Sequence, residues 1–162
     1  MIFVTVGTQL PFDRMIRAVD EWAAESGRRD VFAQIGDGGY TPSSIEWVRF
    51  LTPDETACRL READLIVAHA GMGTIISALQ LKKLIVVFPR RAELGEHRND
   101  HQLATARRFG ERGLVRVVYG AERLAAAIDD SIGTGMIGRD ESGSTARLLA
   151  FLLQFLESAC RR

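Results

Sequence analysis

The chain has 162 residues, of which 46% are hydrophobic and 26% are charged, proportions typical of one folded globular domain. Lys plus Arg and Asp plus Glu number 21 each, so the formal net charge is zero and no overall field favours nucleic acid or an anionic membrane. No apolar run reaches the roughly 20 residues that a membrane-spanning helix requires, and the first residues lack a secretion-signal pattern. Cys58 and Cys160 have neither metal-binding nor redox spacing, which favours reduced thiols in a cytoplasmic protein.

The first third of the chain alternates short apolar runs with a helical pattern. Residues 2–6 predict a strand, and apolar residues at helical spacing predict a helix over residues 15–26. Residues 31–35 predict a second strand, which a glycine-rich loop ends, and residues 46–51 predict a third. This alternation is the first indication of a parallel α/β sheet.

The next helix has a clear start signal. Thr52 is a typical N-cap, Pro53 suits the first helical position, and Glu55 completes a capping box. The helix is predicted to run to about Glu62. It leads into the stretch around which the rest of the chain is arranged.

Residues 63–79 read as an apolar strand that passes through a glycine turn directly into a helix. The strand, residues 65–68, is apolar on both faces and therefore belongs inside a parallel sheet. Gly71 and Gly73 permit a tight turn and a close approach to a ligand, and the free N–H groups of the following helix can receive an anion. Taken alone, the pattern is equally compatible with a purely structural turn.

The remainder of the chain continues the alternation. A strand is predicted over residues 84–88, followed by a long charged connection and a helix over residues 101–112. A sixth strand over residues 114–119 and a helix over residues 121–132 complete the domain.

Three segments are therefore expected along the chain. Residues 1–133 form a domain of Rossmann-like type, with a three-layer parallel sheet of about six strands. Residues 134–143 form a glycine-rich link, and residues 144–162 form a C-terminal helical arm. Seven apolar residues on that arm exceed a narrow helical stripe, which indicates a partner-contacting arm, with packing back on the sheet as the open alternative.

Four polar or glycine-rich loops follow predicted strands: residues 7–9, 50–51, 69–74 and 89–102. Because ligands of parallel sheets bind beyond the carboxyl ends of the strands, these loops are expected to meet at one site.

Several common chemistries do not fit these loops. A dinucleotide fingerprint lacks its third glycine, since Ile76 occupies that position, and no phosphate-binding loop of the GxxxxGK[ST] type is present. Ser77 lacks the frame of a hydrolase nucleophile. His97 and His101 are four residues apart, but no HExxH order supports a metal site.

Three ordered motifs together resemble a known family: residues 3–8 (FVTVGT), 63–74 (ADLIVAHAGMGT) and 99–104 (NDHQLA). The chain is similar to the donor-binding C-terminal half of GT-B glycosyltransferases of family 28, over most of residues 1–130. The similarity is strongest to stand-alone subunits, such as those of the dolichol-pathway N-acetylglucosaminyltransferase and of bacterial exopolysaccharide glucuronosyltransferases.

The resemblance implies that a UDP-sugar binds at the predicted edge. Thr8 and the turn at residues 71–74 would face the diphosphate, the backbone near Phe50 and Leu51 would meet the uracil, and Gln102 would bind sugar hydroxyls. Relatives often carry a glutamate where this chain has Ser77, so the ribose contact is left to Glu96 or Ser77. The expected donor-binding residues are Thr8, Phe50, Leu51, Gly71, Met72, Gly73, Thr74, Arg90, Arg91, Glu96, Asn99 and Gln102.

The implied reaction is inverting hexosyl or glucuronosyl transfer that needs neither a metal nor another cofactor. His69 and His97 are the candidate bases, unless the base belongs to a partner. Arg90 or Arg91 is expected to recognise an acidic donor sugar such as glucuronate, because a guanidinium can hold a carboxylate bidentately.

The expected partner is a membrane-associated, acceptor-binding subunit that presents a lipid-linked saccharide for exopolysaccharide or glycan assembly. This places the chain in the cytoplasm or peripherally at the inner face of the membrane. Two alternatives stay open: a non-catalytic sugar-nucleotide-binding module, or a different Rossmann-like enzyme such as an oxidoreductase.

Overall fold

A computed structural model describes residues 1–134 of the chain. Along the sequence the elements are β1 (Ile2–Thr5), α1 (Asp13–Ser26), β2 (Val31–Gln34), β3 (Glu46–Val48), α2 (Pro53–Glu62), β4 (Leu65–Ala68), α3 (Met72–Gln80), β5 (Leu84–Val87), the 3₁₀ helix η1 (Ala92–Leu94), α4 (His101–Glu111), β6 (Arg116–Val117), the 3₁₀ helix η2 (Ala121–Arg123) and α5 (Leu124–Thr134).

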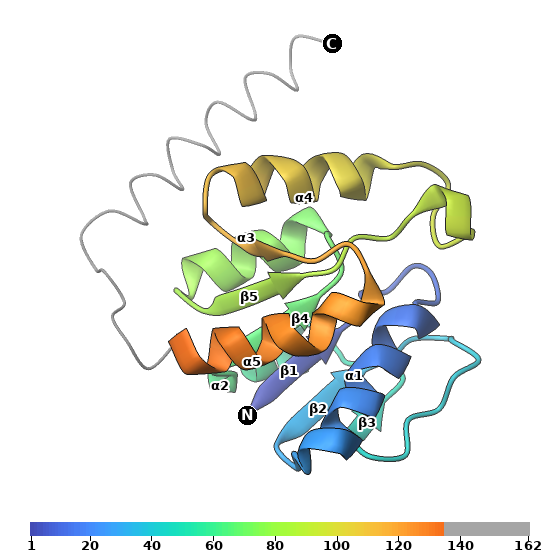
Figure 1. The fold of residues 1–162 in the computed structure, drawn as a ribbon, viewed down its shortest axis with the longest axis vertical. Helices are drawn as coiled ribbons and strands as arrows, with labels where there is room; N and C mark the ends of the chain where they lie inside the picture. Colours follow the sequence, from blue (N-terminus) through green and yellow to red (C-terminus); the bar gives the residue numbers. More distant parts are fainter. Residues whose placement is uncertain (135–162) are drawn as a thin grey trace, which may run out of the picture.

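The strands form one six-stranded sheet in the order β3-β2-β1-β4-β5-β6, and every neighbouring pair is parallel (Figure 1). The strand order reverses between β1 and β4, which is where doubly wound sheets bind their ligands. The predicted Rossmann-like fold class is confirmed.

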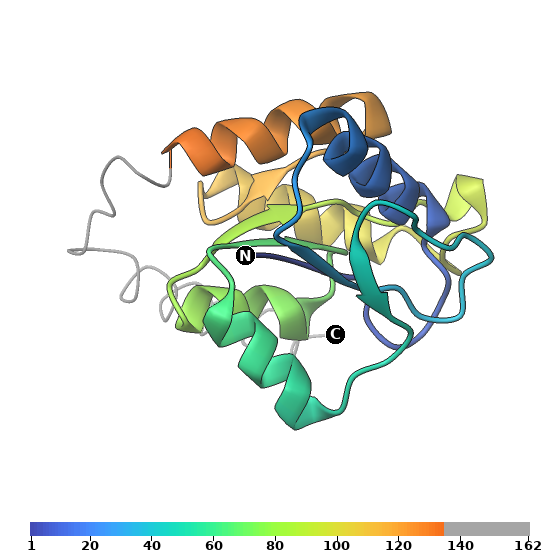
Figure 2. The ribbon, with the colours of Figure 1, turned by 90° about the horizontal axis from the view of Figure 1, so that it is seen from below.

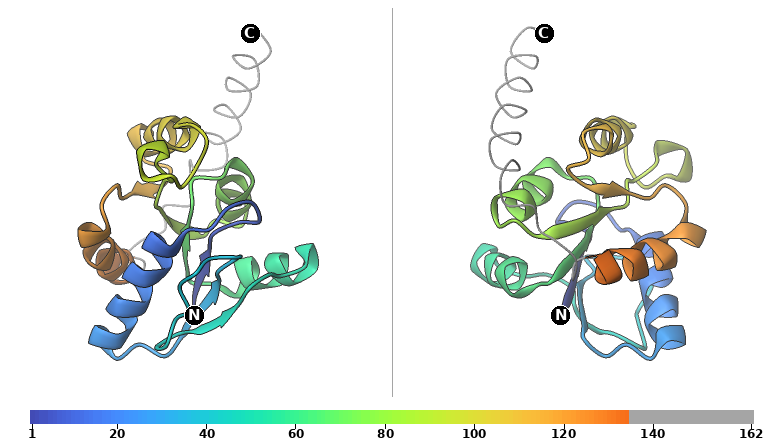
Figure 3. Two further views of the ribbon diagram at one scale, coloured as in Figure 1. Left: turned by 90° about the vertical axis from the view of Figure 1, so that its right-hand side faces the viewer. Right: turned by 60° about the vertical axis from the view of Figure 1, so that its left-hand side comes forward.

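Helices cover both faces of the sheet (Figures 2 and 3). Ile2 and Val4 of β1 pack in the core beneath α1 and α5, whereas Phe3 packs in the opposite core with α2, α3 and α4. The same alternation holds in β4, where Val67 joins the first core and Ile66 the second. Both faces of these central strands are therefore buried, which fixes their register and the position of the residues just beyond them.

The predicted helix boundaries rest on the expected local contacts. The Thr52 hydroxyl accepts from the Glu55 N–H at 3.3 Å, and the Glu55 carboxylate accepts from the Thr52 N–H at 2.7 Å. Helix α1 ends at Gly27, whose φ of 67° places it in the left-handed region.

Both edge strands are shorter than predicted. The run 46–51 pairs as β3 over Glu46–Val48, because its neighbour β2 turns away at Gly36, whose φ is 65°. The run 114–119 pairs as β6 over Arg116–Val117. The first residue of this run is not available to the sheet, because the Leu114 N–H donates to the Phe109 carbonyl in α4. An edge strand has one neighbour, so a local bond of this kind shortens its ladder.

The expected helix over 121–132 begins as a turn of 3₁₀ helix, and α5 continues to Thr134, one residue past the expected domain end. The expected link beyond that point and the arm over residues 144–162 lie outside the described residues. Within residues 1–134, no helix has both the length and the apolar character needed to cross a membrane.

Candidate functional site

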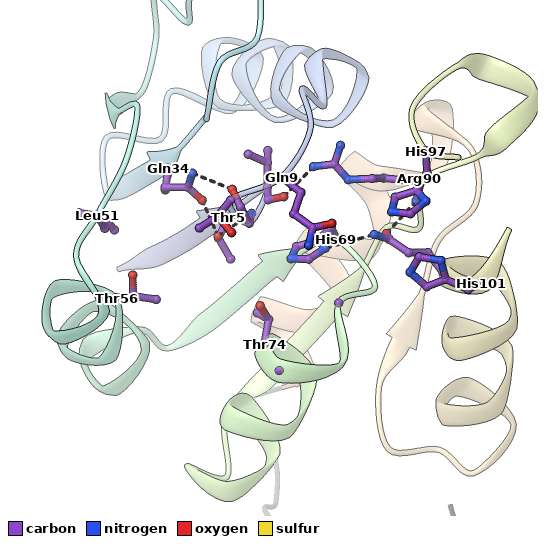
Figure 4. Close-up of a pocket in the computed structure, with 16 residues that line it drawn as sticks. Thr5, Gln9, Gln34, Leu51, Thr56, His69, Thr74, Arg90, His97 and His101 are labelled. Atoms are coloured by element: carbon purple, nitrogen blue, oxygen red, sulfur yellow. Dashed lines mark hydrogen bonds between the residues drawn. The ribbon is translucent and has the colours of Figure 1, made fainter. Parts of the chain in front are cut away.

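A cavity of about 370 Å³ opens at the carboxyl ends of the strands, where the strand order reverses (Figure 4). Its volume lies in the range of small-ligand sites. It is lined by Thr5, Val6, Gly7, Thr8, Gln9, Gln34, Leu51, Thr56, His69, Gly71, Gly73, Thr74, Arg90, His97, His101 and Gln102. The predicted meeting of loops at this edge is therefore present.

One wall of the cavity is a buried polar pair at the ends of β1 and β2. The Thr5 hydroxyl donates to the Gln34 side-chain oxygen at 2.7 Å and accepts from the Gly7 N–H at 3.2 Å. The Gln34 amide in turn donates to the carbonyls of Gly7 and Arg49, both at 3.0 Å. Because these bonds join Gly7 to Thr5 of β1 and to Gln34 of β2, the start of the loop after β1 is held in one conformation.

His69, directly after β4, lies at the centre of the site between two glycines. A Cβ added at Gly7 would lie 2.6 Å from the His69 Nε2 atom. A Cβ added at Gly71 would overlap the His69 Cε1 atom and lie 2.8 Å from both ring nitrogens. Glycine is required at both positions because the imidazole occupies the space of a side chain.

Gln102, the second residue of α4, fixes the orientation of this imidazole. Its side-chain oxygen accepts from the backbone N–H groups of Ala70 and Arg90, both at 3.2 Å. That assigns the amide nitrogen to the side facing His69, 3.4 Å from Nδ1. Nδ1 is then the acceptor, and the proton of the neutral ring is assigned to Nε2.

The charge state of His69 follows from its surroundings. Burial, and to a smaller extent the positive charge of Arg90, lowers the pKa of His69 to about 4. The ring is therefore neutral at pH 7 and is a weak base.

The other two histidines of the chain line the same cavity (Figure 4). The rings of His97 and His101 meet edge to face at a centroid separation of 4.4 Å. Within the described part of the chain, the His97 Nδ1 atom is buried without a hydrogen-bond partner. Burial lowers the pKa of His97, and the neighbouring His101 adds to the effect. Among residues 1–134, no cluster of three or more His, Cys, Asp or Glu is arranged to hold a metal ion.

The floor of the cavity is the first turn of α3. Gly71 is the N-cap of this helix, and among residues 1–134 no side chain caps its first turn. The first N–H groups of an α-helix have no partner inside the helix and carry the positive end of its dipole. Because Gly71, Gly73 and Thr74 line the cavity, this arrangement can bind an anionic group such as a phosphate.

The structure brings most of the expected donor-binding residues together and leaves five outside the cavity. Phe50 is 49% exposed, and Met72, the first residue of α3, packs against the core. The Asn99 side-chain oxygen accepts from the His101 backbone N–H at 3.3 Å. Arg91 and Glu96 complete the five outside the lining.

Arg90 and Glu96 have contacts that differ from those expected. The Arg90 guanidinium donates to backbone carbonyls, and its side chain is only 2% exposed, so it offers little to a sugar carboxylate. The Glu96 carboxylate is bound on both oxygens by Arg14 at 2.6 and 2.8 Å, which occupies it instead of a ribose. Ser77, the alternative ribose contact, does not line the cavity.

Seven lining residues are absent from the expected donor-binding and catalytic residues, and three of them, Gly7, Gln9 and His101, lie in loops that were expected at the site. The other four are Thr5, Val6, Gln34 and Thr56. Thr5 and Gln34 lie inside predicted strands, where nothing marked them as functional. Their position as the last residues of neighbouring parallel strands was the available signal.

A parallel sheet of this order, with a glycine at the helix N-terminus beside its reversal point, is typical of doubly wound α/β domains, which bind their ligands at this point. Residues 1–137 match the model of the glycosyltransferase family 28 C-terminal domain, and the chain belongs to this family.

The chain is 29% identical over 122 residues to the human UDP-N-acetylglucosamine transferase subunit ALG13. The match covers 69% of this chain and 10% of that protein, so the chain spans about a tenth of this relative.

Solved structures show the same fold. The glycotransferase of kitacinnamycin has a TM-score of 0.69 at 23% identity, covering 92% of this chain and 39% of that one. MurG of Acinetobacter baumannii has a TM-score of 0.58 at 18% identity, covering 83% and 40%. An NMR structure of ALG13 has a TM-score of 0.56 at 19% identity, covering 80% of this chain and 84% of that one.

Proposed function

We propose that this chain is the donor-binding subunit of a UDP-sugar-dependent glycosyltransferase. The observation that carries the proposal is the uncapped N-terminus of α3, lined by Gly71, Gly73 and Thr74, at the point where the strand order reverses. Family membership and the similarity to a UDP-N-acetylglucosamine transferase subunit support it.

The donor is placed along the cavity in three parts. The diphosphate lies at the first turn of α3 and against Thr8, and the uracil lies toward Leu51. Thr56 lines the cavity between these two regions, so its hydroxyl is the proposed ribose contact in place of Glu96 or Ser77. The sugar lies toward His97 and Gln102, where the remaining amide N–H can donate to a hydroxyl.

The proposed reaction is metal-independent inverting transfer. As the bond to the sugar breaks, negative charge grows on the UDP diphosphate, and the α3 N–H groups and helix dipole stabilise it. Neutral His69, with its proton assigned to Nε2, serves as a hydrogen-bond donor. His97 is the better candidate for the base that deprotonates the acceptor hydroxyl, because it lines the cavity at the end proposed for the sugar, unless the partner supplies that base.

The acceptor is proposed to come from a membrane-associated partner subunit that binds a lipid-linked saccharide. The support is three exposed apolar residues on the connections that follow β3, β5 and β6: Phe50, Leu94 and Tyr119, exposed by 49%, 52% and 44%. These loops share the sheet edge with the cavity, so a partner that covers them also closes the site. This places the chain peripherally at the inner face of the membrane. Purified chain is expected to transfer far less sugar than the co-expressed pair, and equal rates would contradict the partner.

The donor sugar is proposed to be a hexose or glucuronate used in exopolysaccharide or glycan assembly. Recognition of glucuronate now rests on Arg91 alone, whose guanidinium pairs with Glu93 at the surface. An exposed pair of this kind is weak and can exchange for a ligand carboxylate.

A thermal-denaturation panel tests the proposal. UDP and UDP-sugars at about 100 times their dissociation constant are expected to stabilise the chain by about 2.7 kcal/mol, and NAD is expected to have no effect. Stabilisation by NAD and not by UDP would replace the glycosyltransferase with an oxidoreductase. Equal responses to UDP-glucuronate and UDP-N-acetylglucosamine, unchanged in Arg91→Ala, would remove the acidic-sugar assignment.

A further inference from the structure

Arg90 is the largest side chain with almost no exposure in the described part of the chain. It follows β5 by three residues and reaches across the end of the sheet to the loop after β1. A buried guanidinium is costly unless its N–H groups are bonded, so the identity of its partners shows what it holds.

The partners are the backbone of the loop that joins β1 to α1. Nη2 donates to the carbonyls of Val6 at 2.7 Å and Leu10 at 2.6 Å, and Nη1 donates to the carbonyl of Pro11 at 2.5 Å. The guanidinium therefore holds both ends of the segment that carries Thr8 and Gln9, two residues of the cavity wall. Nη1 also lies 3.4 Å from the Glu96 carbonyl, on the second loop of the site.

A second arginine holds that loop from the other side. Arg14 of α1 binds the Glu96 carboxylate on both oxygens and donates to the Pro89 carbonyl at 3.2 Å. The same carboxylate accepts from the Arg91 N–H at 2.9 Å. The loop between β5 and α4, which carries His97, is thereby attached to α1.

Two stacked phenylalanines connect the arginines. The rings of Phe12 and Phe88 are 5.7 Å apart, with Arg90 4.6 Å from the Phe12 centroid and Arg14 4.2 Å from the Phe88 centroid. Arg14 also lies 5.5 Å from the Phe12 centroid, so both guanidinium groups contact this ring pair, which restricts the geometry of both cations.

We propose that Arg90, assisted by Arg14 and Glu96, is a positioning residue that pre-sets the two loops that form walls of the donor cavity. Gln9 and His97, one from each loop, also line a second cavity with Leu10 and Arg98, so they form the partition between the two spaces. The clamp fixes this partition before the ligand arrives, which reduces the ordering cost of binding. The proposal rests on the proposed function, because its functional readout is the binding of a UDP-sugar. Its structural basis is the set of backbone contacts made by Arg90.

The test compares Arg90→Lys and Glu96→Gln with the wild-type full chain. Arg116→Lys is the control. The Arg116 guanidinium donates to the Asp130 carboxylate at 2.8 Å, and neither residue lines the cavity. Hydrogen exchange at residues 7–11 and the dissociation constant of UDP are measured for each folded variant. Since at least two side chains lose their pre-set positions, we expect UDP affinity to fall by about tenfold and loop exchange to accelerate, with protection in β1 and β4 retained.

The outcomes separate the two proposals. If Arg90 and Glu96 have a merely structural role, Arg90→Lys and Glu96→Gln lower the melting temperature, but the folded variants bind UDP with wild-type affinity and keep the loop exchange unchanged. That result would overturn the positioning role. Glu96→Gln keeps the size of this largely buried side chain and removes only its charge, so it reports even where Arg90→Lys fails to fold. If the wild type itself does not bind UDP, the proposed function fails, and the exchange measurements still decide the clamp.

Discussion

Replacing Gly71 by alanine is expected to destabilise the chain by about 2 kcal/mol and to abolish measurable UDP binding. The added Cβ would overlap the His69 ring, which cannot move away because Gly7 adjoins its other edge and Gln102 holds Nδ1. Either the ring or the first turn of α3 must shift, and both line the cavity. Urea unfolding and UDP titration measure the two effects.

A double-mutant cycle with His69→Ala identifies the cause. Removing the ring opens the space that the new Cβ needs, so the free energies of the two substitutions are expected to be less than additive. Additive losses, or a Gly71→Ala chain as stable as the wild type, would show that the imidazole does not occupy this space.

Acidification is expected to weaken the fold through His69. Burial keeps its pKa at about 4 in the folded chain, below the ordinary value of 6.5. Between these values the unfolded chain binds more protons, so the stabilisation is complete above pH 6.5 and is lost progressively as the pH falls toward 4. At pH 5 the expected loss is on the order of 2 kcal/mol relative to pH 7.5.

Urea unfolding of the wild type and His69→Asn at the two pH values measures this contribution. His97 also has a lowered pKa and acts in the same direction, so the comparison is made between the two chains and not within one. The variant is expected to have the smaller pH dependence. The same slope in both chains would show that His69 is not buried in its neutral form.

The fold was readable from the sequence because its signals are local. The Thr52 capping box, the apolar alternation of β1 and β4, and the polar or glycine-rich loops after strands each depend on neighbouring residues. The edge strands were overestimated because apolar content does not reveal where a partner strand ends. Gly36 and the bond from Leu114 to Phe109 set those ends.

The site was only partly readable, because a charged residue in a loop has no visible partner in a sequence. Arg90 and Glu96 have the residue types of a sugar-binding loop, yet they bind Val6, Leu10 and Arg14, which are more than 75 positions away. Thr5 and Gln34 were missed for the converse reason, since their pairing arises only when β1 and β2 lie side by side. Glycines were recognised as close-approach positions, but the group that approaches Gly71 within the fold is the His69 ring.

The central claim is that the first turn of α3 receives the diphosphate of a UDP-sugar, and a UDP titration followed by amide NMR signals tests it most directly. Gly73→Ala is titrated in parallel, because a Cβ at Gly73 meets no heavy atom within 4 Å and so adds a methyl group to the cavity without disturbing the fold. The account predicts that UDP shifts the amide signals of residues 71–74 and 7–8 far more than uridine does, and that Gly73→Ala weakens binding with no loss of stability. Absence of UDP binding, or shifts confined to another surface of the chain, would contradict it.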